Sequence, residues 1–213
     1  MGDMRSEADG RLTRNGATYD IVFRRRLKQP IDKVWAAVTL PERIADWFAT
    51  MTFDPDLRVG AKLTIAFGPG DQTFGEVVAV EAPRLFAYRW PHPGGENSTV
   101  RFDLAADGDG TLLTFSQTGL GGKVRSGMAD IGAGWHKFVD QLTDLMAGTR
   151  TEHGHREHWQ SYKATVDALW GSDDSDGAFR TTGATCEVVF RRHLRRPLEK
   201  VWAALTAPAV SSL

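Results

Sequence analysis

The stretch PIDKVWAAVTLPERIADWF, residues 30–48, contains the signals of two successive helices. Pro30 suits the first position of a helix, because the amide hydrogen that proline lacks would have no partner there. The apolar residues after it fall at helical spacing: Ile31, Val34, Trp35 and Val38. Thr39 is a good N-cap for a second, short helix. One side of that second helix carries Ile44, Trp47 and Phe48.

Segments with alternating apolar residues lie on both sides of these helices. Thr18–Leu27 precedes them and reads as a strand rich in Ile, Val and Phe. Six further strands are predicted after them: Met51–Asp54, Ala61–Phe67, Thr73–Glu81, Arg84–Trp90, Thr99–Ala105 and Thr111–Thr118. Arg25 is an exception to the alternation, since it falls on the apolar face of its strand. Either its charged end reaches water or it binds an anionic group.

A long amphipathic helix is predicted over Ile131–Met146. Its apolar stripe consists of Trp135, Phe138, Leu142, Leu145 and Met146. A strand, two helices, a run of strands and one long helix indicate an α+β fold rather than alternating α/β units. A curved antiparallel sheet with one apolar face needs a cover, and this last helix is long enough to supply it.

The beginning of the first strand and helix recurs later in the chain. GATYDIVFRRRLKQPIDKVWAAVTLP begins at Gly16, and GATCEVVFRRHLRRPLEKVWAALTAP begins at Gly183. The two segments are identical at 16 of 26 positions without a gap, at an offset of 167 residues. A period of this length indicates a duplicated domain rather than a solenoid repeat.

The repeat divides the chain into five parts. We expect a flexible tail over 1–15, one domain over 16–150 and an additional amphipathic helix over 151–170. An acidic linker follows over 171–180, and 181–213 would be the truncated start, one strand plus one helix, of a second, duplicated domain. So short a segment cannot bury enough apolar area to fold alone.

Composition excludes several classes of protein. The 26 basic and 27 acidic residues give a formal charge of −1, so no positive field attracts nucleic acid or an anionic membrane. No apolar run approaches the length of a membrane span, and the amino terminus has no secretion signal. A single cysteine, Cys186, suits a reducing compartment. We therefore expect a cytoplasmic protein without nucleic-acid or membrane partners.

Five motifs occur in order along the chain: PIDKVWAAVTLPERIADWF, the Val59-Gly60 step, GEVVAVEAPRLFAYRW from Gly75, GTLLTFSQTGL from Gly110 and GWHKFVDQL from Gly134. In these ordered motifs the sequence resembles the SRPBCC or START-like helix-grip superfamily, in the branch of homologues of the activator of heat-shock protein 90 ATPase. The resemblance spans about residues 17–150. One departure is Gln117, where members of this branch often have histidine.

The resemblance implies a sheet wrapped around the carboxyl-terminal helix, with a cavity that commonly holds a small apolar or aromatic molecule. Large aromatic side chains converge on the expected interior, and Gln117 and the Tyr88 hydroxyl add polar groups. The candidate ligand-binding residues are Trp47, Phe48, Phe67, Tyr88, Trp90, Phe102, Phe115, Gln117, Trp135 and Phe138. The alternative interpretation is that these side chains only fill an ordinary core.

No catalytic constellation is evident in the sequence. It lacks a G-x-S-x-G elbow, an H-E-x-x-H helix and a glycine-rich phosphate loop. His153, His155 and His158 lie close together, with His136 nearby in sequence, and could bind zinc or nickel adventitiously. We interpret them instead as the polar start of a helix, and expect no catalytic residue, no metal and no cofactor.

Three functions remain as hypotheses. The first is a binding module for a small hydrophobic molecule, which the aromatic interior favours. The second is a cyclase or hydratase on the same fold, in which Tyr88 and Gln117 position a carbonyl and a water. The third is a co-chaperone that stimulates heat-shock protein 90 ATPase, although we do not expect a chaperone partner. A homodimer stays an open alternative.

Overall fold

The computed structural model describes residues 9–16, 18–91, 97–121, 125–151, 153–170, 178–182, 185–189 and 196–206. The chain divides into two compact units, Met1–Gly171 and Ser172–Leu213. Each unit is described by itself below. No helix within the described residues is both long and apolar enough to cross a membrane.

The first unit contains eight strands and four helices among its described residues. Its elements in order are β1 (Arg11–Asn15), β2 (Thr18–Leu27), α1 (Ile31–Thr39), α2 (Pro41–Ile44), β3 (Thr50–Asp54), β4 (Lys62–Gly68), β5 (Asp71–Glu81), β6 (Leu85–Pro91), β7 (Asn97–Asp107), β8 (Gly110–Gly121), α3 (Arg125–Ala147) and α4 (His155–Trp170).

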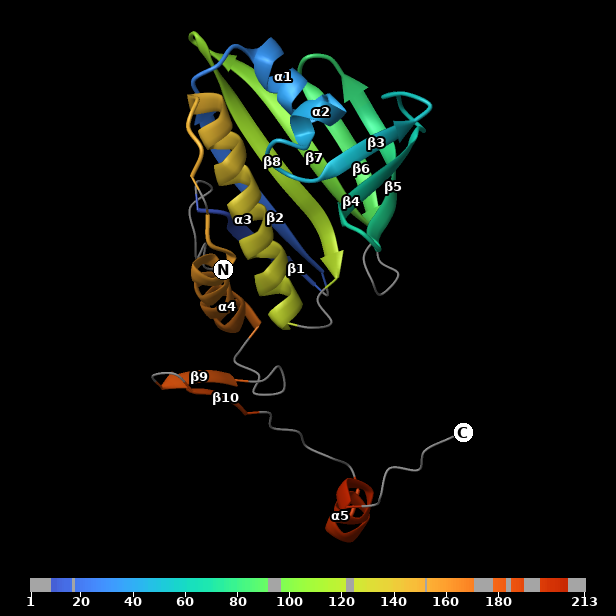
Figure 1. The fold of residues 1–213 in the computed structure, drawn as a ribbon, viewed down its shortest axis with the longest axis vertical. Coiled ribbons are helices and arrows are strands. Elements are labelled where there is room, and N and C mark those ends of the chain that lie inside the picture. Colours follow the sequence, from blue (N-terminus) through green and yellow to red (C-terminus); the bar gives the residue numbers. More distant parts are fainter. Residues whose placement is uncertain are drawn as a thin grey trace. The chain divides into compact units, whose positions relative to one another are not determined.

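The strands form one open, curved antiparallel sheet in the order β1-β2-β8-β7-β6-β5-β4-β3 (Figure 1). The long helix α3 packs on the concave side against β2, while α1 packs against β7 and β8 (Figure 1). This arrangement confirms the α+β helix-grip fold with two short helices after the predicted first strand. The two-residue alternation of β8 turns Leu113, Phe115 and Gln117 inward, and all three are fully buried.

The amino-terminal tail expected over 1–15 is partly wrong. Residues 11–15 form β1, which pairs antiparallel with β2 from Asn15↔Thr18 to Arg11↔Val22. Gly16 lies in the hairpin turn with a φ of 62°. Asn-Gly is a strong hairpin signal because glycine adopts positive φ without steric cost. The sequence therefore did contain the signal for this strand.

The predicted cap of the second helix is also wrong. Thr39 is the last residue of α1, and its hydroxyl donates to the carbonyl of Trp35 at 2.6 Å. The N-cap of α2 is Leu40, which makes no side-chain capping bond. Pro41 at the start of α2 already lacks one of the amide hydrogens that a cap would satisfy.

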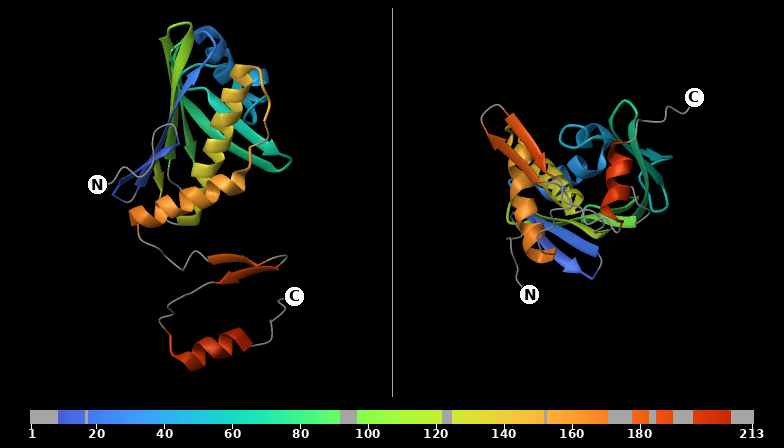
Figure 2. Two further views of the ribbon diagram at one scale, coloured as in Figure 1. Left: turned by 90° about the vertical axis from the view of Figure 1, so that its left-hand side faces the viewer. Right: turned by 90° about the horizontal axis from the view of Figure 1, so that it is seen from below.

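Helix α4 lies across α3 (Figure 2). The ring of Tyr162 on α4 packs against two glycines, Gly132 on α3 and Gly10 before β1. A Cβ on Gly132 would lie 2.5 Å from Tyr162 Cδ1, and a Cβ on Gly10 would collide with the tyrosine hydroxyl. Because neither glycine has a side chain, α4 can pack closely against α3 and the residues before β1.

The second unit contains β9 (Ala178–Thr182), β10 (Thr185–Val189) and α5 (Leu198–Thr206). Adding the repeat offset of 167 to the residue numbers that bound β1 and α1 gives the bounds of β9 and α5. The register repeats as well, since Thr182↔Thr185 corresponds to Asn15↔Thr18 and Ala178↔Val189 to Arg11↔Val22. The strand pairing and the helix of the first unit therefore recur in the second.

Candidate functional site

The ten candidate residues come together on the concave side of the sheet. Trp47 and Phe48 follow α2, Phe67 is on β4, and Trp135 and Phe138 are on α3. The remaining five come from β6, β7 and β8: Tyr88, Trp90, Phe102, Phe115 and Gln117. We call this set the aromatic cluster.

Phe48 is the centre of the aromatic cluster. Its ring stacks on Trp135 with centroids 5.1 Å apart, and it meets Phe138 edge-on at 4.9 Å. It also makes an edge contact with Phe67 at 5.3 Å, and Trp135 reaches Phe115 at 4.3 Å. Such offset and edge-on geometries are the favourable ones for aromatic pairs. The cluster thus connects the short helices, the sheet and α3.

The cluster has a buried end and an accessible end. Tyr88 and Phe115 are fully buried, whereas Phe48, Trp90 and Phe138 are partly exposed. Phe67 faces the concave side, where its ring contacts those of Phe48, Trp90 and Phe138, but it is 43% exposed rather than covered by the core. It lies at the edge of the cluster because it is the second-last residue of β4, where the sheet no longer covers it.

Gln117 joins α3 to the sheet through a chain of hydrogen bonds. The indole Nε1 of Trp135 donates to Gln117 Oε1, and Gln117 Nε2 donates to Ser98 Oγ at 2.7 Å. Ser98 in turn donates to the carbonyl of Trp90 at 3.0 Å. A buried amide needs such partners. Gln117 thereby fixes the position of Trp135, a role that sequence reasoning missed together with Ser98.

The hydroxyl of Tyr88 is the exceptional polar group in the cluster. Its oxygen is buried and has no hydrogen-bond partner among the described residues. Burial raises the pKa of Tyr88 far above that of an ordinary tyrosine, so the group stays protonated and able to donate. An unpaired buried hydroxyl costs about 1–3 kcal/mol, and its presence in a native fold asks for an explanation.

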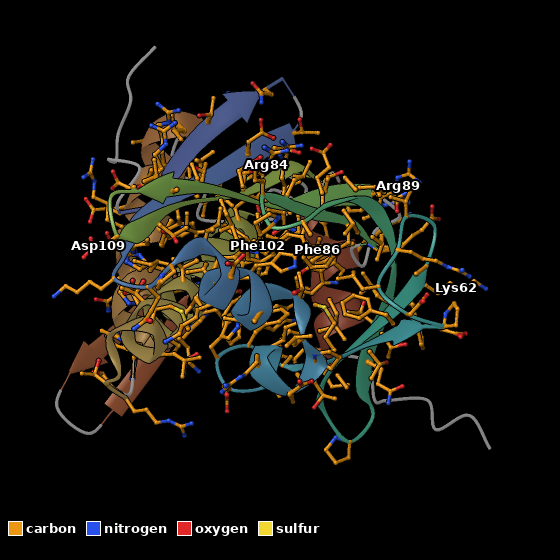
Figure 3. The ribbon with its side chains drawn as sticks, turned by 90° about the horizontal axis from the view of Figure 1, so that it is seen from above. Lys62, Arg84, Phe86, Arg89, Phe102 and Asp109 are labelled. Carbon is orange, nitrogen blue, oxygen red and sulfur yellow. The ribbon has the colours of Figure 1, made fainter. Side chains whose placement is uncertain are left out.

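Phe86, which was not among the ten, extends the buried end of the cluster. It stacks on Phe102 with centroids 6.0 Å apart and contacts Tyr88 at 5.5 Å. Figure 3 shows Phe86 and Phe102 between the sheet and the short helices, with Arg84 and Arg89 on the outer side of the sheet. The two-residue period from Phe86 through Tyr88 to Trp90 was the signal for it.

Pockets lined by described residues also occur on the surface. Four of these are lined by residues outside the aromatic cluster, such as the pocket of about 300 Å³ between Gln29 and Met146. That pocket is lined by Lys33 and Arg43 as well. These pockets are separate from the candidate site.

The three clustered histidines each face a different aspartate of α3. His153 Nε2 lies 3.0 Å from Asp144 Oδ2, and His155 Nε2 lies 3.9 Å from Asp130 Oδ1. His158 faces Asp140. The three histidines therefore do not converge on one point. Each contacts a different aspartate, so their contacts are distributed along α3.

The curved sheet around α3 and the ordered sequence motifs described above define a helix-grip protein of the SRPBCC class. The family model described as activator of Hsp90 ATPase homolog 1-like protein matches residues 28–147, more than half of the chain. The chain belongs to this family. No curated protein matches the sequence.

Several solved structures are similar to the chain. CalU16 from Micromonospora echinospora is 26% identical with a TM-score of 0.58, over 76% of this chain and 95% of CalU16. MLL2253 from Mesorhizobium loti is 28% identical with a TM-score of 0.56, over 62% of this chain and 99% of its own. DynU16, a protein of the dynemicin biosynthetic locus, is 31% identical with a TM-score of 0.54, over 63% of this chain and 49% of DynU16.

Proposed function

We propose that this helix-grip domain binds a small hydrophobic molecule at the aromatic cluster and donates a hydrogen bond to it from Tyr88. The observation that carries the proposal is the buried Tyr88 hydroxyl, which lacks a partner among the described residues. A ligand oxygen that accepts its proton would remove the cost of the unpaired donor. Apolar walls with a few placed polar groups are typical of small-molecule sites.

The accessible end of the cluster supports entry of such a ligand. Phe67 and Trp90 stack with ring centroids 6.3 Å apart, and Phe138 lies 6.1 Å from Phe67. These partly exposed rings offer flat apolar faces at the accessible end of the aromatic cluster. Tyr88 continues the row inward, since its ring lies 6.4 Å from Trp90.

The hydrogen-bond chain through Gln117 makes Tyr88 the available donor. Gln117 already accepts from Trp135 and donates to Ser98. This chain holds the Gln117 side chain in place, whereas the proton of the Tyr88 hydroxyl has no acceptor among the described residues. The chemistry of the site therefore favours an aromatic molecule with a carbonyl or ether oxygen at its buried end.

Native mass spectrometry of the purified chain tests the proposal. We expect the wild type to retain a small molecule that is lost on denaturation, and Tyr88→Phe to retain much less of it. Phe74→Leu is the control, because Phe74 is 64% exposed and outside the aromatic cluster. Equal retention by Tyr88→Phe and the wild type would contradict a role for the hydroxyl.

A cyclase-type enzyme is the second candidate, and the likeness to DynU16 from a biosynthetic locus favours it. In this version the Tyr88 hydroxyl polarises a substrate carbonyl, and the aromatic rings hold a reactive chain in a folded form. Once a substrate is identified, Tyr88→Phe should lower kcat more than it raises KM. Unchanged turnover in a Tyr88→Phe, Gln117→Leu double variant would remove this candidate.

We also propose that β9, β10 and α5 are the opening of a duplicated helix-grip domain, which then starts at residue 178, inside the linker expected over 171–180, and has two strands before its helix instead of the one expected over 181–213. The equal offset, the equal strand register and the equal helix bounds support this. Leu198 and Trp202 on α5 occupy the positions of Ile31 and Trp35 on α1. They are 77% and 65% exposed, whereas their counterparts pack against the core.

A further inference from the structure

A second group of chemically active side chains lies between α3 and α4. His136 and Asp140 are one turn apart on α3, and His158 comes from α4. Each offers one ligand atom, and these atoms all lie within 4.8 Å of one another. We propose that His136, Asp140 and His158 bind a divalent transition-metal ion of the zinc type, with water completing the coordination.

The distances in this group approach those of a tetrahedral site. Zinc bonds of about 2.0–2.1 Å place neighbouring ligand atoms ~3.3–3.4 Å apart. His136 Nε2 lies 3.4 Å from Asp140 Oδ2, which already matches the distance expected between two neighbouring ligand atoms. His158 Nε2 lies 4.0 Å from the same oxygen. The side chain of His158 is 23% exposed, so its ring has room for the rotation that would bring Nε2 toward a shared ion.

Tyr162 selects the tautomer of His136 that a metal needs. Its hydroxyl donates its one proton to the carbonyl of Asp9 at 2.9 Å. The tyrosine oxygen also lies 3.3 Å from His136 Nδ1. Because the proton is committed to the carbonyl, the oxygen accepts from Nδ1–H. A neutral His136 therefore directs the lone pair of Nε2 toward the carboxylate of Asp140.

The two imidazole rings are stacked, with centroids 3.9 Å apart and an interplanar angle of 17°. An imidazole binds a metal ion in the plane of its ring, so two rings this close to parallel do not share one ion in the arrangement of the structure. Metal binding therefore requires the His158 ring to rotate out of the stack, which its partial exposure allows.

Arg25 decides which oxygen of Asp140 is available. Its Nη2 donates to Asp140 Oδ1 at 2.8 Å, and its side chain is only 14% exposed. Oδ2 is left facing the two imidazoles. This pair also explains why an arginine stands on the apolar face of β2. The positive charge of Arg25 opposes a second cation nearby, so the affinity for metal is expected to be moderate.

The packing of α4 holds the group in place. Tyr162, seated against Gly10 and Gly132, fixes α4 on α3 and with it the position of His158 over His136. His136, whose Nδ1 contacts the Tyr162 hydroxyl, loses little freedom when it binds a metal. The group faces α4, while Trp135 and Phe138 on the same helix belong to the aromatic cluster.

Titration of the chelator-treated full chain with Zn²⁺ by calorimetry tests the proposal, with Co²⁺ absorption as a second probe. We expect one Zn²⁺ per chain and a ligand-field spectrum of low-coordinate Co²⁺. His158→Ala and Asp140→Asn should each weaken Zn²⁺ binding by at least about tenfold. His155→Ala and His153→Ala are matched controls, since their partners are Asp130 and Asp144.

A further variant tests whether weaker Zn²⁺ binding is caused only by unfolding of the protein. His158→Gln keeps hydrogen-bonding capacity at a partly exposed position, and its circular dichroism should match that of the wild type. Zn²⁺ should raise the melting temperature of the wild type but not that of His158→Gln. Absence of Zn²⁺ binding by the folded wild type would overturn the proposal. An equal loss in His155→Ala and His158→Ala would also overturn it, because it would indicate adventitious binding by surface histidines.

Discussion

The indole nitrogen of Trp135 on α3 donates to the side-chain oxygen of Gln117 on β8, and both side chains are buried. This bond joins the long helix to the middle of the sheet at the point where the aromatic cluster begins. The position therefore serves, in this chain, to hold a tryptophan.

Replacing Gln117 by leucine should lower the free energy of unfolding by about 1–3 kcal/mol, because it leaves the Trp135 donor buried and unpaired. Urea denaturation followed by tryptophan fluorescence measures the effect. Ser116→Ala is the control on the opposite face of β8, with an expected change within about 0.5 kcal/mol. Equal stability of Gln117→Leu and the wild type would show that the bond does not hold Trp135.

Two glycines of α3 should respond to alanine with opposite signs. Gly132→Ala places a Cβ 2.5 Å from the Tyr162 ring and should destabilise the fold by about 1–3 kcal/mol. Gly134→Ala meets no heavy atom within 4 Å and should stabilise it by about 0.5–1 kcal/mol. Thermal unfolding of the two variants checks this contrast. A gain in stability for Gly132→Ala would mean that α4 does not pack closely on α3.

Asp144 should make the stability depend on pH in the acid range. Hydrogen bonds from Thr151 first, and then from His153, hold the pKa of this carboxyl below its usual 3.8. A lowered pKa stabilises the fold fully above 3.8, and the contribution is lost as the pH falls below 3.8 toward the folded-state value. Unfolding of the wild type and Asp144→Asn between about pH 6 and pH 3 measures it. The difference between the two proteins should shrink as the pH falls, and a constant difference would contradict the assignment.

The two copies of the repeat should differ in their response to the same substitution. Trp35→Ala removes a side chain packed against the core and should cost about 2–3 kcal/mol. Trp202→Ala changes the equivalent residue of α5, which is 65% exposed, and should stay within about 0.5 kcal/mol. Urea denaturation of the full chain compares them. A similar loss in both variants would indicate that α5 is packed as α1 is.

Much of the fold was predictable because the alternation in the strands is clear. Val100, Phe102 and Leu104 on β7 point inward as the two-residue period requires. β1 was missed because residues 11–15 contain only one apolar side chain, Leu12. Its pairing with β2 depends on the Asn15-Gly16 turn rather than on hydrophobicity.

The site was predictable only as a set of inward-facing residues. The period of each strand and helix gave the aromatic residues, but not which side chains meet. The bonds from Trp135 through Gln117 to Ser98 depend on how α3 is rotated over β8 and β7. The approach of His158 to His136 depends on Tyr162 and two distant glycines. Such three-dimensional relationships leave no local signal in sequence.

The central claim is that Tyr88 donates a hydrogen bond to a ligand oxygen, and a matched pair of ligands tests it most directly. 1-Indanone and indane share a bicyclic skeleton, and only the ketone accepts a hydrogen bond. Calorimetry should show the wild type binding 1-indanone about tenfold more tightly than indane, a difference of about 1.4 kcal/mol. Tyr88→Phe should bind both equally. The same preference for the ketone in both proteins, or no binding of either ligand to the wild type, would contradict the account.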